Sequence, residues 1–226
     1  MPDGGHPYRS APEKIRQNTK LQLPATGDVI AMNAPDGMIR VTDIPAIPVV
    51  FFGDIDGEIQ DAILQSLQGF LASLDEQLLV IPRLQVEFMV DPGIPGGKNR
   101  SGDYYSALHS VQGNLVLGVT GNGLWDEFPH PRFVFGSAFC GTAILSLHRF
   151  IHDSASKGLA LTRIGKEIPK ILALACGIPA CSDQACYLSY HWTMEDIDRN
   201  RYVCRDCRMA LGEAIGECVG MGIQGS

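Results

Sequence analysis

The sequence predicts an α/β domain with a mixed sheet and flanking helices. Short continuous apolar runs, which are typical of buried strands, alternate with longer segments in which apolar residues recur at helical spacing. The 226-residue chain is 45% hydrophobic and 19% charged, which is ordinary for a globular protein. We therefore expect one main domain, rather than an all-β sandwich or a helical bundle.

The elements of this domain are expected from Ile47 onwards. The run Ile47–Phe52, IPVVFF, predicts a buried strand, and Ile55–Leu74 has the apolar spacing of an amphipathic helix. Further strands are predicted at Leu78–Met89, Asn114–Thr120 and Ala143–Phe150, and further helices at Gly102–His109, at Leu159–Cys176 and within Thr193–Val203, capped by Thr193.

The helix predicted at Leu159–Cys176 contains Pro169 and meets Gly177. Glycine is common just after the last helical residue, so Gly177 predicts the C-terminal end. Proline inside a helix costs about 3 kcal/mol, whereas at the first helical position it costs little. The sequence therefore predicts either a kink near Lys166 or a helix that begins near Ile168.

Composition divides the chain into three regions. Residues 1–45 are rich in proline and glycine, which predicts an extended N-terminal arm with one short strand at Asp28–Met32. Residues 46–210 form the predicted domain, and residues 211–226 a C-terminal tail. We expect the arm to dock on its own domain or on a protein partner.

Charge and hydropathy exclude some classes of protein. The formal net charge of −7 argues against broad affinity for nucleic acid or an anionic membrane surface. No apolar run reaches the roughly 20 residues that a membrane span needs, and the N-terminus lacks the apolar core of a secretory signal. We therefore expect a cytoplasmic protein.

Four of the seven cysteines form two close pairs near the C-terminus. Four residues separate Cys181 from Cys186, two separate Cys204 from Cys207, and 17 lie between the pairs. Two short clips joined by a loop are what a tetrahedral four-thiolate site requires. Because four thiolates leave no open position, we expect one structural zinc ion on Cys181, Cys186, Cys204 and Cys207.

Other interpretations of the cysteines stay open at this point. A four-sulfur site can hold iron as well as zinc. The four thiols could instead be unconnected or form labile disulfides, although an odd number of cysteines in a reducing compartment favours a metal. The remaining Cys140, Cys176 and Cys218 are expected to be buried thiols.

Several other stretches accompany the cysteines. Together with the cysteine pattern C-x4-C-x17-C-x2-C, these stretches resemble the archaemetzincins over about residues 47–209. The archaemetzincins are zinc peptidases with the pattern H-E-x-x-H-x-x-G-x-x-H-C followed by three further cysteines. The resemblance implies a compact metzincin-like fold with a C-terminal four-cysteine zinc subsite. Its stretches are GVTGNGLWDE at Gly118–Glu127, FVFGSAFCGTAILSLHRF at Phe133–Phe150, KEIPK at Lys166–Lys170 and EDIDR at Glu195–Arg199.

The resemblance also implies that the catalytic residues are missing. Aligning on Cys181 places Lys170, Leu174 and Ala180 at the three zinc-binding histidine positions and Ile171 at the general-base glutamate. None of these side chains is an imidazole donor, and no carboxylate is present to take a proton from a zinc-bound water. We expect a pseudo-peptidase in which Ile171 and Leu174 pack in the core where the catalytic metal would lie.

Histidines offer a different set of metal ligands. His148 and His152 would share one face if their segment were helical, but the resemblance places His148 at a strand end, which favours surface or core roles. His191 is isolated in the sequence and nearest to the cysteine clips. Each is expected to be an ordinary satisfied or exposed histidine.

Three functions are compatible with these observations. The first is a protein-binding or scaffold subunit whose former peptide cleft binds an extended segment as an added strand. The second is an active zinc peptidase with a rearranged site that recruits His148, His152 or His191. In the third, arginines around the second cysteine clip contact nucleic acid, which the negative net charge disfavours. Zinc stoichiometry separates the first two.

Overall fold

The computed structural model describes residues 45–74, 78, 81–95, 97, 99–126 and 132–220. The chain divides into two units, Met1–Val41 and Thr42–Ser226, and every described residue lies in the second. Residues 1–44 of the predicted arm, with the strand at Asp28–Met32, fall outside the described residues.

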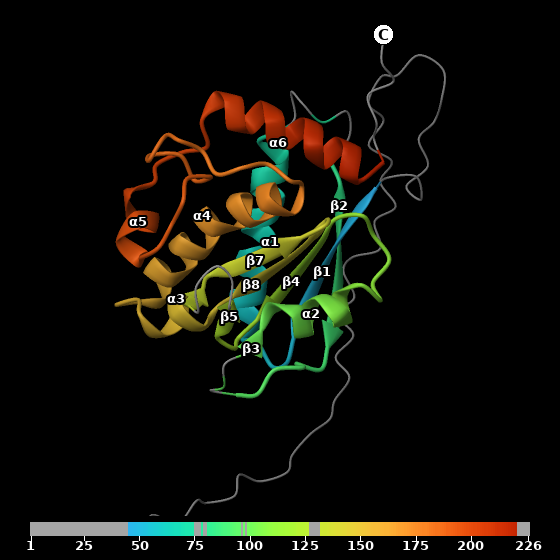
Figure 1. Ribbon diagram of the computed structural model, residues 1–226, viewed down its shortest axis with the longest axis vertical. Coiled ribbons are helices and arrows are strands. Elements are labelled where there is room, and N and C mark those ends of the chain that lie inside the picture. Colours follow the sequence, from blue (N-terminus) through green and yellow to red (C-terminus); the bar gives the residue numbers. More distant parts are fainter. Residues whose placement is uncertain are drawn as a thin grey trace, which may run out of the picture. The chain divides into compact units, whose positions relative to one another are not determined.

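A five-stranded mixed sheet forms the centre of the second unit (Figure 1). Four neighbouring strands are parallel, and the fifth pairs antiparallel at one edge, which confirms the predicted mixed sheet. In spatial order the strands are β2 (Arg83–Met89), β1 (Ala46–Phe52), β4 (Val116–Thr120), β8 (Thr142–Ser146) and β7 (Gly136–Phe139).

A smaller sheet and six helices complete the described part of the chain. The smaller sheet contains β3 (Asn99–Arg100), β5 (Leu124–Asp126) and β6 (Arg132–Val134). The helices are α1 (Gly57–Ala72), α2 (Ser101–Leu108), α3 (His148–His152), α4 (Lys157–Ala175), α5 (Met194–Arg199) and α6 (Arg205–Cys218). None of the described helices is long and apolar enough to cross a membrane.

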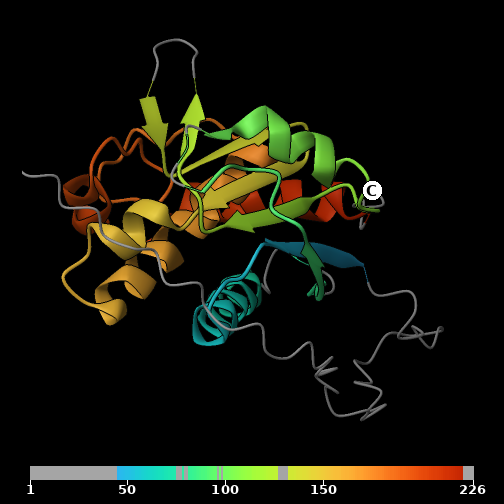
Figure 2. The ribbon, with the colours of Figure 1, turned by 90° about the horizontal axis from the view of Figure 1, so that it is seen from below.

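Helices cover both faces of the large sheet, as Figure 2 shows for α1 and α2. Side chains of β1 alternate between the two faces: Val49 and Phe51 pack in the core under α1 and α4, whereas Val50 and Phe52 pack under α2. Because both faces are buried, β1 reads as a continuous apolar run rather than an alternating one.

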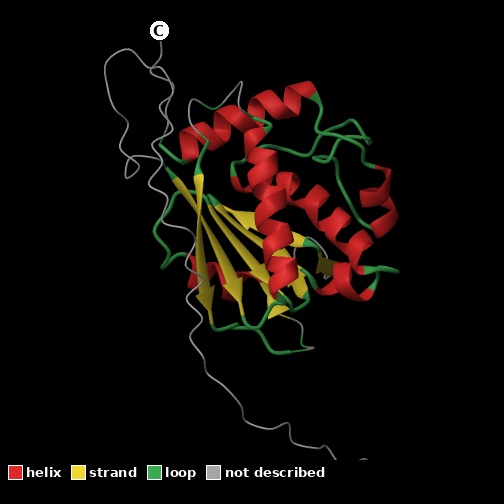
Figure 3. Ribbon diagram, turned by 180° about the vertical axis from the view of Figure 1, so that it is seen from behind, coloured by secondary structure: helices red, strands yellow, loops and turns green. Residues whose placement is uncertain are grey.

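Helix α4 crosses the sheet beside α1 (Figure 3) and is continuous through Pro169. The expectation of a helix beginning near Ile168 is therefore wrong. Packing of the buried face of α4 offsets the hydrogen bond that the proline removes. The predicted end is confirmed: Gly177 has φ +78°, and the Ile178 amide donates to the Ala173 carbonyl at 2.8 Å.

Two of the predicted boundaries that differ from the structure are the end of β8 and the C-terminal limit of the domain. The strand predicted at Ala143–Phe150 ends at Ser146, whose Oγ accepts the His148 amide at 3.3 Å, and the chain turns there into α3. At the other end, the predicted domain stops at residue 210, whereas α6 continues to Cys218 and buries Leu211 in the core. The strand ends early because the Ser146 side chain bonds to the backbone at the turn. The domain extends further because α6 buries an apolar face.

Candidate metal centre and adjoining cleft

The four predicted zinc ligands lie together in space. One sulfur atom from each of Cys181, Cys186, Cys204 and Cys207 lies within 4.8 Å of the others, and the Cys181 and Cys204 Sγ atoms are 3.9 Å apart. Sulfurs held tetrahedrally about 2.3 Å from one zinc ion are about 3.8 Å from one another. The cluster therefore fits one zinc ion, with four thiolates and no open position for water.

Local structure orients the second cysteine pair. Cys204 is the N-cap of α6 and Cys207 lies in its first turn, so both sulfurs lie at the helix end that favours negative charge. The Cys204 amide also donates to the Cys186 Sγ at 3.4 Å. Of the four ligands, Cys186 is fully buried, whereas the others are partly exposed. Such backbone support holds thiolates in place around a metal.

Asn200 connects the loops on the two sides of the cluster. Its buried side-chain amide donates to the Gln184 carbonyl at 2.8 Å, the Cys186 carbonyl at 2.9 Å and the Ser189 hydroxyl at 3.0 Å. The predicted helix α5, which ends just before Asn200, has the expected cap: Thr193 and Asp196 form a reciprocal capping box.

One face of α4 holds the segment between the two cysteine pairs. Arg163 donates two hydrogen bonds, of 2.8 and 2.6 Å, to the carboxylate of Asp198. Lys166 donates to the carbonyls of Ile197 and Asn200 at 3.1 and 2.9 Å, at the C-terminal end of α5. Burial lowers the pKa of Lys166, yet these carbonyls and the macrodipole favour its charge.

Further along the same face, Glu167, Lys170 and His191 form a buried cluster. The Lys170 Nζ lies 3.1 Å from Glu167 Oε1, and the His191 Nδ1 lies 2.8 Å from Glu167 Oε2. Burial would raise the pKa of Glu167, but the Lys170 charge and the His191 hydrogen bond hold it below its ordinary value. The cluster therefore contains a buried carboxylate with a buried ammonium as its counter-ion.

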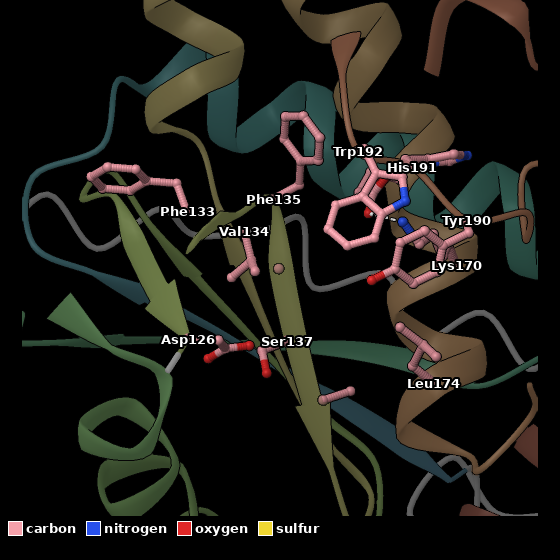
Figure 4. A pocket seen from close by; sticks show the side chains of 13 residues that line it. Asp126, Phe133, Val134, Phe135, Ser137, Lys170, Leu174, Tyr190, His191 and Trp192 are labelled. Carbon is pink, nitrogen blue, oxygen red and sulfur yellow. Dashed lines mark hydrogen bonds and ion pairs between the residues drawn. The ribbon is translucent and has the colours of Figure 1, made fainter. Parts of the chain in front are cut away.

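A cavity of about 260 Å³ opens between α4 and strand β7. Lys170 and Leu174 of α4 lie on one side of it (Figure 4). Gly136 and Ala138 of β7 also line the cavity. Large apolar side chains at its rim are unusually exposed. Their exposed fractions are 59% for Trp192, 47% for Phe133, 43% for Tyr190 and 38% for Leu174.

The β7–β8 hairpin positions the β7 side of the cavity. Its two-residue turn, Cys140–Gly141, has φ of +46° and +78°, and the Gly141 amide donates to the Ala175 carbonyl at the end of α4 at 3.0 Å. Ile171 lies beneath the hairpin and is only 1% exposed. A Cβ added to Gly136 would lie 2.3 Å from Ile171 Cδ1 and 2.8 Å from the Ile144 carbonyl oxygen.

Gly136→Ala is therefore expected to lower the free energy of unfolding by about 1–3 kcal/mol, the usual cost of overpacking. Gly158→Ala in α4, where an added Cβ meets nothing within 4 Å, is the matched control and is expected to have no such cost. Urea unfolding of the zinc-loaded variants measures both. Adding Ile171→Val, which removes Cδ1, should recover part of the loss in Gly136→Ala. Equal stability of the two glycine variants would contradict the close packing of Ile171 against β7.

Comparison with known proteins was made by sequence and by structure. No protein-family model matches the chain. A 99-residue segment is 32% identical to the archaemetzincin of Methanopyrus kandleri, covering 42% of this chain and 54% of that protein. The crystal structure of the M. kandleri archaemetzincin superposes with a TM-score of 0.60 at 22% identity, covering 76% of this chain and 96% of that one. Part of this chain is therefore similar in sequence to an archaemetzincin, and the chain has the archaemetzincin fold.

A second archaemetzincin structure agrees with this result. The protein from Archaeoglobus fulgidus superposes with a TM-score of 0.55 at 20% identity, over 72% of this chain and 98% of that one. The two structural likenesses establish the archaemetzincin fold. The sequence match, in contrast, spans about half the length of the M. kandleri protein.

Within the archaemetzincin fold, the residues aligned with the catalytic positions lie in different settings. Lys170 and Leu174 line the cavity, Ile171 packs beneath Gly136, and Ala180 is exposed. The expectation that Leu174 is a core residue is therefore wrong, because it faces the cavity between α4 and β7. The surroundings of these positions are only partly apolar, because Lys170 forms an ion pair with the buried carboxylate of Glu167.

The three predicted histidines do not converge on one site. His148 and His152 contact each other on α3 as tilted rings with centroids 4.5 Å apart, so the expectation of a strand end there is wrong. His191 is buried against Glu167. Among the described residues, the four cysteines are the one group of three or more His, Cys, Asp or Glu side chains able to meet at one ion.

The other three cysteines also differ from expectation. Cys140 is exposed in the β7–β8 turn, whereas Cys176 and Cys218 are partly buried with their sulfurs 3.8 Å apart. Sequence reasoning missed the Glu167–Lys170–His191 cluster. The spacing of Glu167 and Lys170, three residues apart on a helix, was the one signal that could have indicated it. His191 comes from a distant segment and gave no signal.

Proposed function

We propose that the protein is a catalytically inactive archaemetzincin-like protein, or pseudo-peptidase, that holds one structural zinc ion and binds an extended segment of a protein partner. The observation that carries the proposal is the cleft itself. It joins an open strand edge, a wall of exposed aromatic side chains and a lysine at the position of a metal ligand.

The open edge of β7 provides backbone partners for such a segment. Among the described residues, β7 pairs on one side only, with β8. The Ser146 amide donates to the Phe135 carbonyl at 2.8 Å. In an antiparallel ladder, successive residues alternate between bonding to the partner strand and pointing away from it. The N–H and C=O groups of Gly136 and Ala138 therefore point towards the cavity, where an added strand would bind.

The chemistry of the aligned positions supports the loss of catalysis. A catalytic zinc site needs three protein donors and an open position for water. Lys170 and Leu174 supply no neutral nitrogen donor, and Ile171, buried under Gly136, supplies no carboxylate base. The four-cysteine cluster has no open position, so its zinc would hold the fold rather than activate water.

Zinc stoichiometry and a peptidase assay test the proposal that the protein is catalytically inactive. After purification without added metal, we expect elemental analysis by inductively coupled plasma mass spectrometry to find one zinc ion per chain. We also expect no cleavage of casein or of quenched fluorescent peptides with added zinc, with thermolysin as the active control. The alternative, a zinc peptidase with a rearranged site, requires a second zinc that survives substitution of Cys204 and Cys207 and accompanies cleavage.

Peptide binding is tested separately. Random hexapeptides with acetylated N-termini are incubated with the immobilised protein, and the retained peptides are identified by mass spectrometry. Ala138→Pro removes an outward N–H from the edge strand and is expected to abolish retention, whereas Ala138→Ser keeps the N–H and should preserve it. Equal retention by both variants, with zinc content unchanged, would exclude strand addition to β7.

A further inference from the structure

Lys170 is the one ammonium that lines the cavity between α4 and β7 in the described part of the chain. Its side chain is only 11% exposed, which is rare for lysine. A buried ammonium is costly unless its charge and its hydrogen-bond donors are matched by partners. The hydrogen-bond partners of Lys170 therefore indicate which kind of ligand group the cavity can bind.

The protein supplies only part of what this ammonium can bind. Lys170 has three N–H donors. One faces Glu167 Oε1 at 3.1 Å, and the ring of Tyr190 lies 5.8 Å from the Nζ. The other carboxylate oxygen of Glu167 is bonded by His191, so the charge of Glu167 is shared between two donors. Lys170 is thus left with donor capacity on the side of the cavity.

The cavity is polarised along its length. Lys170 lies at one end with Tyr190 and Trp192, whereas Asp126, the other acidic side chain in the lining besides Glu167, lies across the cavity beside Ser137 (Figure 4). The Ser101 hydroxyl donates to Asp126 at 2.7 Å. A negatively charged ligand group is therefore repelled by Asp126 at one end, whereas at the other end Lys170 offsets the charge of Glu167 and offers its remaining N–H donors.

We infer that the cleft recognises a carboxylate of the bound peptide, which accepts hydrogen bonds from Lys170 while the adjoining residue packs against Tyr190 and Trp192. The inference rests on the proposed peptide-binding function. A carboxylate is favoured over a backbone carbonyl because its full negative charge attracts the ammonium more strongly than the partial charge of a carbonyl oxygen does.

The size of the cavity limits how this carboxylate is presented. About 260 Å³ is below the roughly 300–1,000 Å³ that drug-sized ligands occupy. The cavity therefore suits the end of one residue rather than a whole cofactor. Two sources have the same chemistry, the C-terminal carboxylate of a chain and the side chain of an aspartate or glutamate, and the experiment separates them.

The test uses three acetylated hexapeptide libraries. The first ends in a free carboxylate, and the second in a carboxamide, both without Asp or Glu. The third ends in a carboxamide and contains one Asp or Glu at each position in turn. We expect the wild-type protein to retain the first or the third library about tenfold or more better than the second. Preference for the first identifies a chain terminus, and preference for the third identifies an acidic side chain.

Variants at Lys170 assign the effect to its charge. Lys170→Met combined with Glu167→Gln removes both charges, so that no buried charge is left unpaired, and should abolish the preference for carboxylates. Lys170→Arg keeps the charge and should preserve it. Zinc content and circular dichroism of each variant report folding, so that only folded proteins are compared. A misfolded double variant is replaced by Lys170→Gln, which should likewise abolish the preference.

The outcomes distinguish this inference from the function on which it rests. Equal retention of all three libraries by the wild-type protein, or an undiminished preference in the uncharged variants, overturns the carboxylate site and leaves peptide binding intact. No retention of any library overturns both.

Discussion

Replacing Cys204 and Cys207 together by alanine is expected to remove the zinc ion and to unfold the segment that surrounds it, residues 178–218. The reason is that this segment contains only α5, α6 and the loops around them. Structural zinc contributes about 10–16 kcal/mol in small zinc domains, comparable to the whole stability of a typical protein, about 5–15 kcal/mol. Zinc content should fall from one per chain to none.

Limited proteolysis and circular dichroism measure the structural part of this result. Cleavage is expected first between Cys181 and Cys204, because the loops there depend on the four sulfurs for their position. Cys140→Ala is the matched control, since Cys140 is exposed and outside the cluster. It should retain zinc and resist protease like the wild type. A double cysteine variant that keeps its zinc would show that other residues bind the metal.

The second large effect is expected at Glu167. Glu167→Gln removes the counter-ion of a buried ammonium, and breaking a buried ion pair by removing one partner costs about 3–5 kcal/mol. We expect a loss of about 3 kcal/mol in the free energy of unfolding, at the low end, because the glutamine oxygen can still accept from Lys170 or His191. Urea unfolding of zinc-loaded protein measures this loss.

A double-mutant cycle tests the assignment. Lys170→Met is also expected to destabilise the protein, since it leaves Glu167 with His191 alone. The double variant with Glu167→Gln and Lys170→Met should be more stable than the sum of the two single losses predicts, because it contains no unpaired buried charge. Strict additivity would mean that the two side chains do not interact.

The same pair makes a prediction about pH. The pKa of Glu167 in the folded protein lies below its ordinary value of 4.5, because Lys170 and His191 outweigh the effect of burial. The stabilisation is therefore complete above pH 4.5 and is lost as the pH falls through the lower, folded pKa. The difference in unfolding free energy between wild type and Glu167→Gln should shrink over that range. Acid release of zinc affects both proteins and cancels in the difference.

Features that depend on neighbouring residues could be established from the sequence. The buried run at Ile47–Phe52 predicted β1, and Gly177 predicted the end of α4 through its tolerance of positive φ. The spacing of the two cysteine pairs predicted the cluster that the structure brings together. In each case a short stretch of chain contains the whole physical signal: periodicity, backbone freedom, or paired ligands on one clip.

Only the tertiary structure could decide what surrounds the aligned catalytic positions. From the sequence, Lys170 was only a residue that is no imidazole donor. The fold pairs it with Glu167 and brings His191 from another segment to the same carboxylate, and the ion pair lowers the cost of burying the lysine. Leu174 has the helical spacing of a core residue but lines the cavity between α4 and β7 and is 38% exposed. The surroundings of these side chains depend on which distant segments of the chain lie next to one another in the fold. The spacing of residues along the sequence does not give this information.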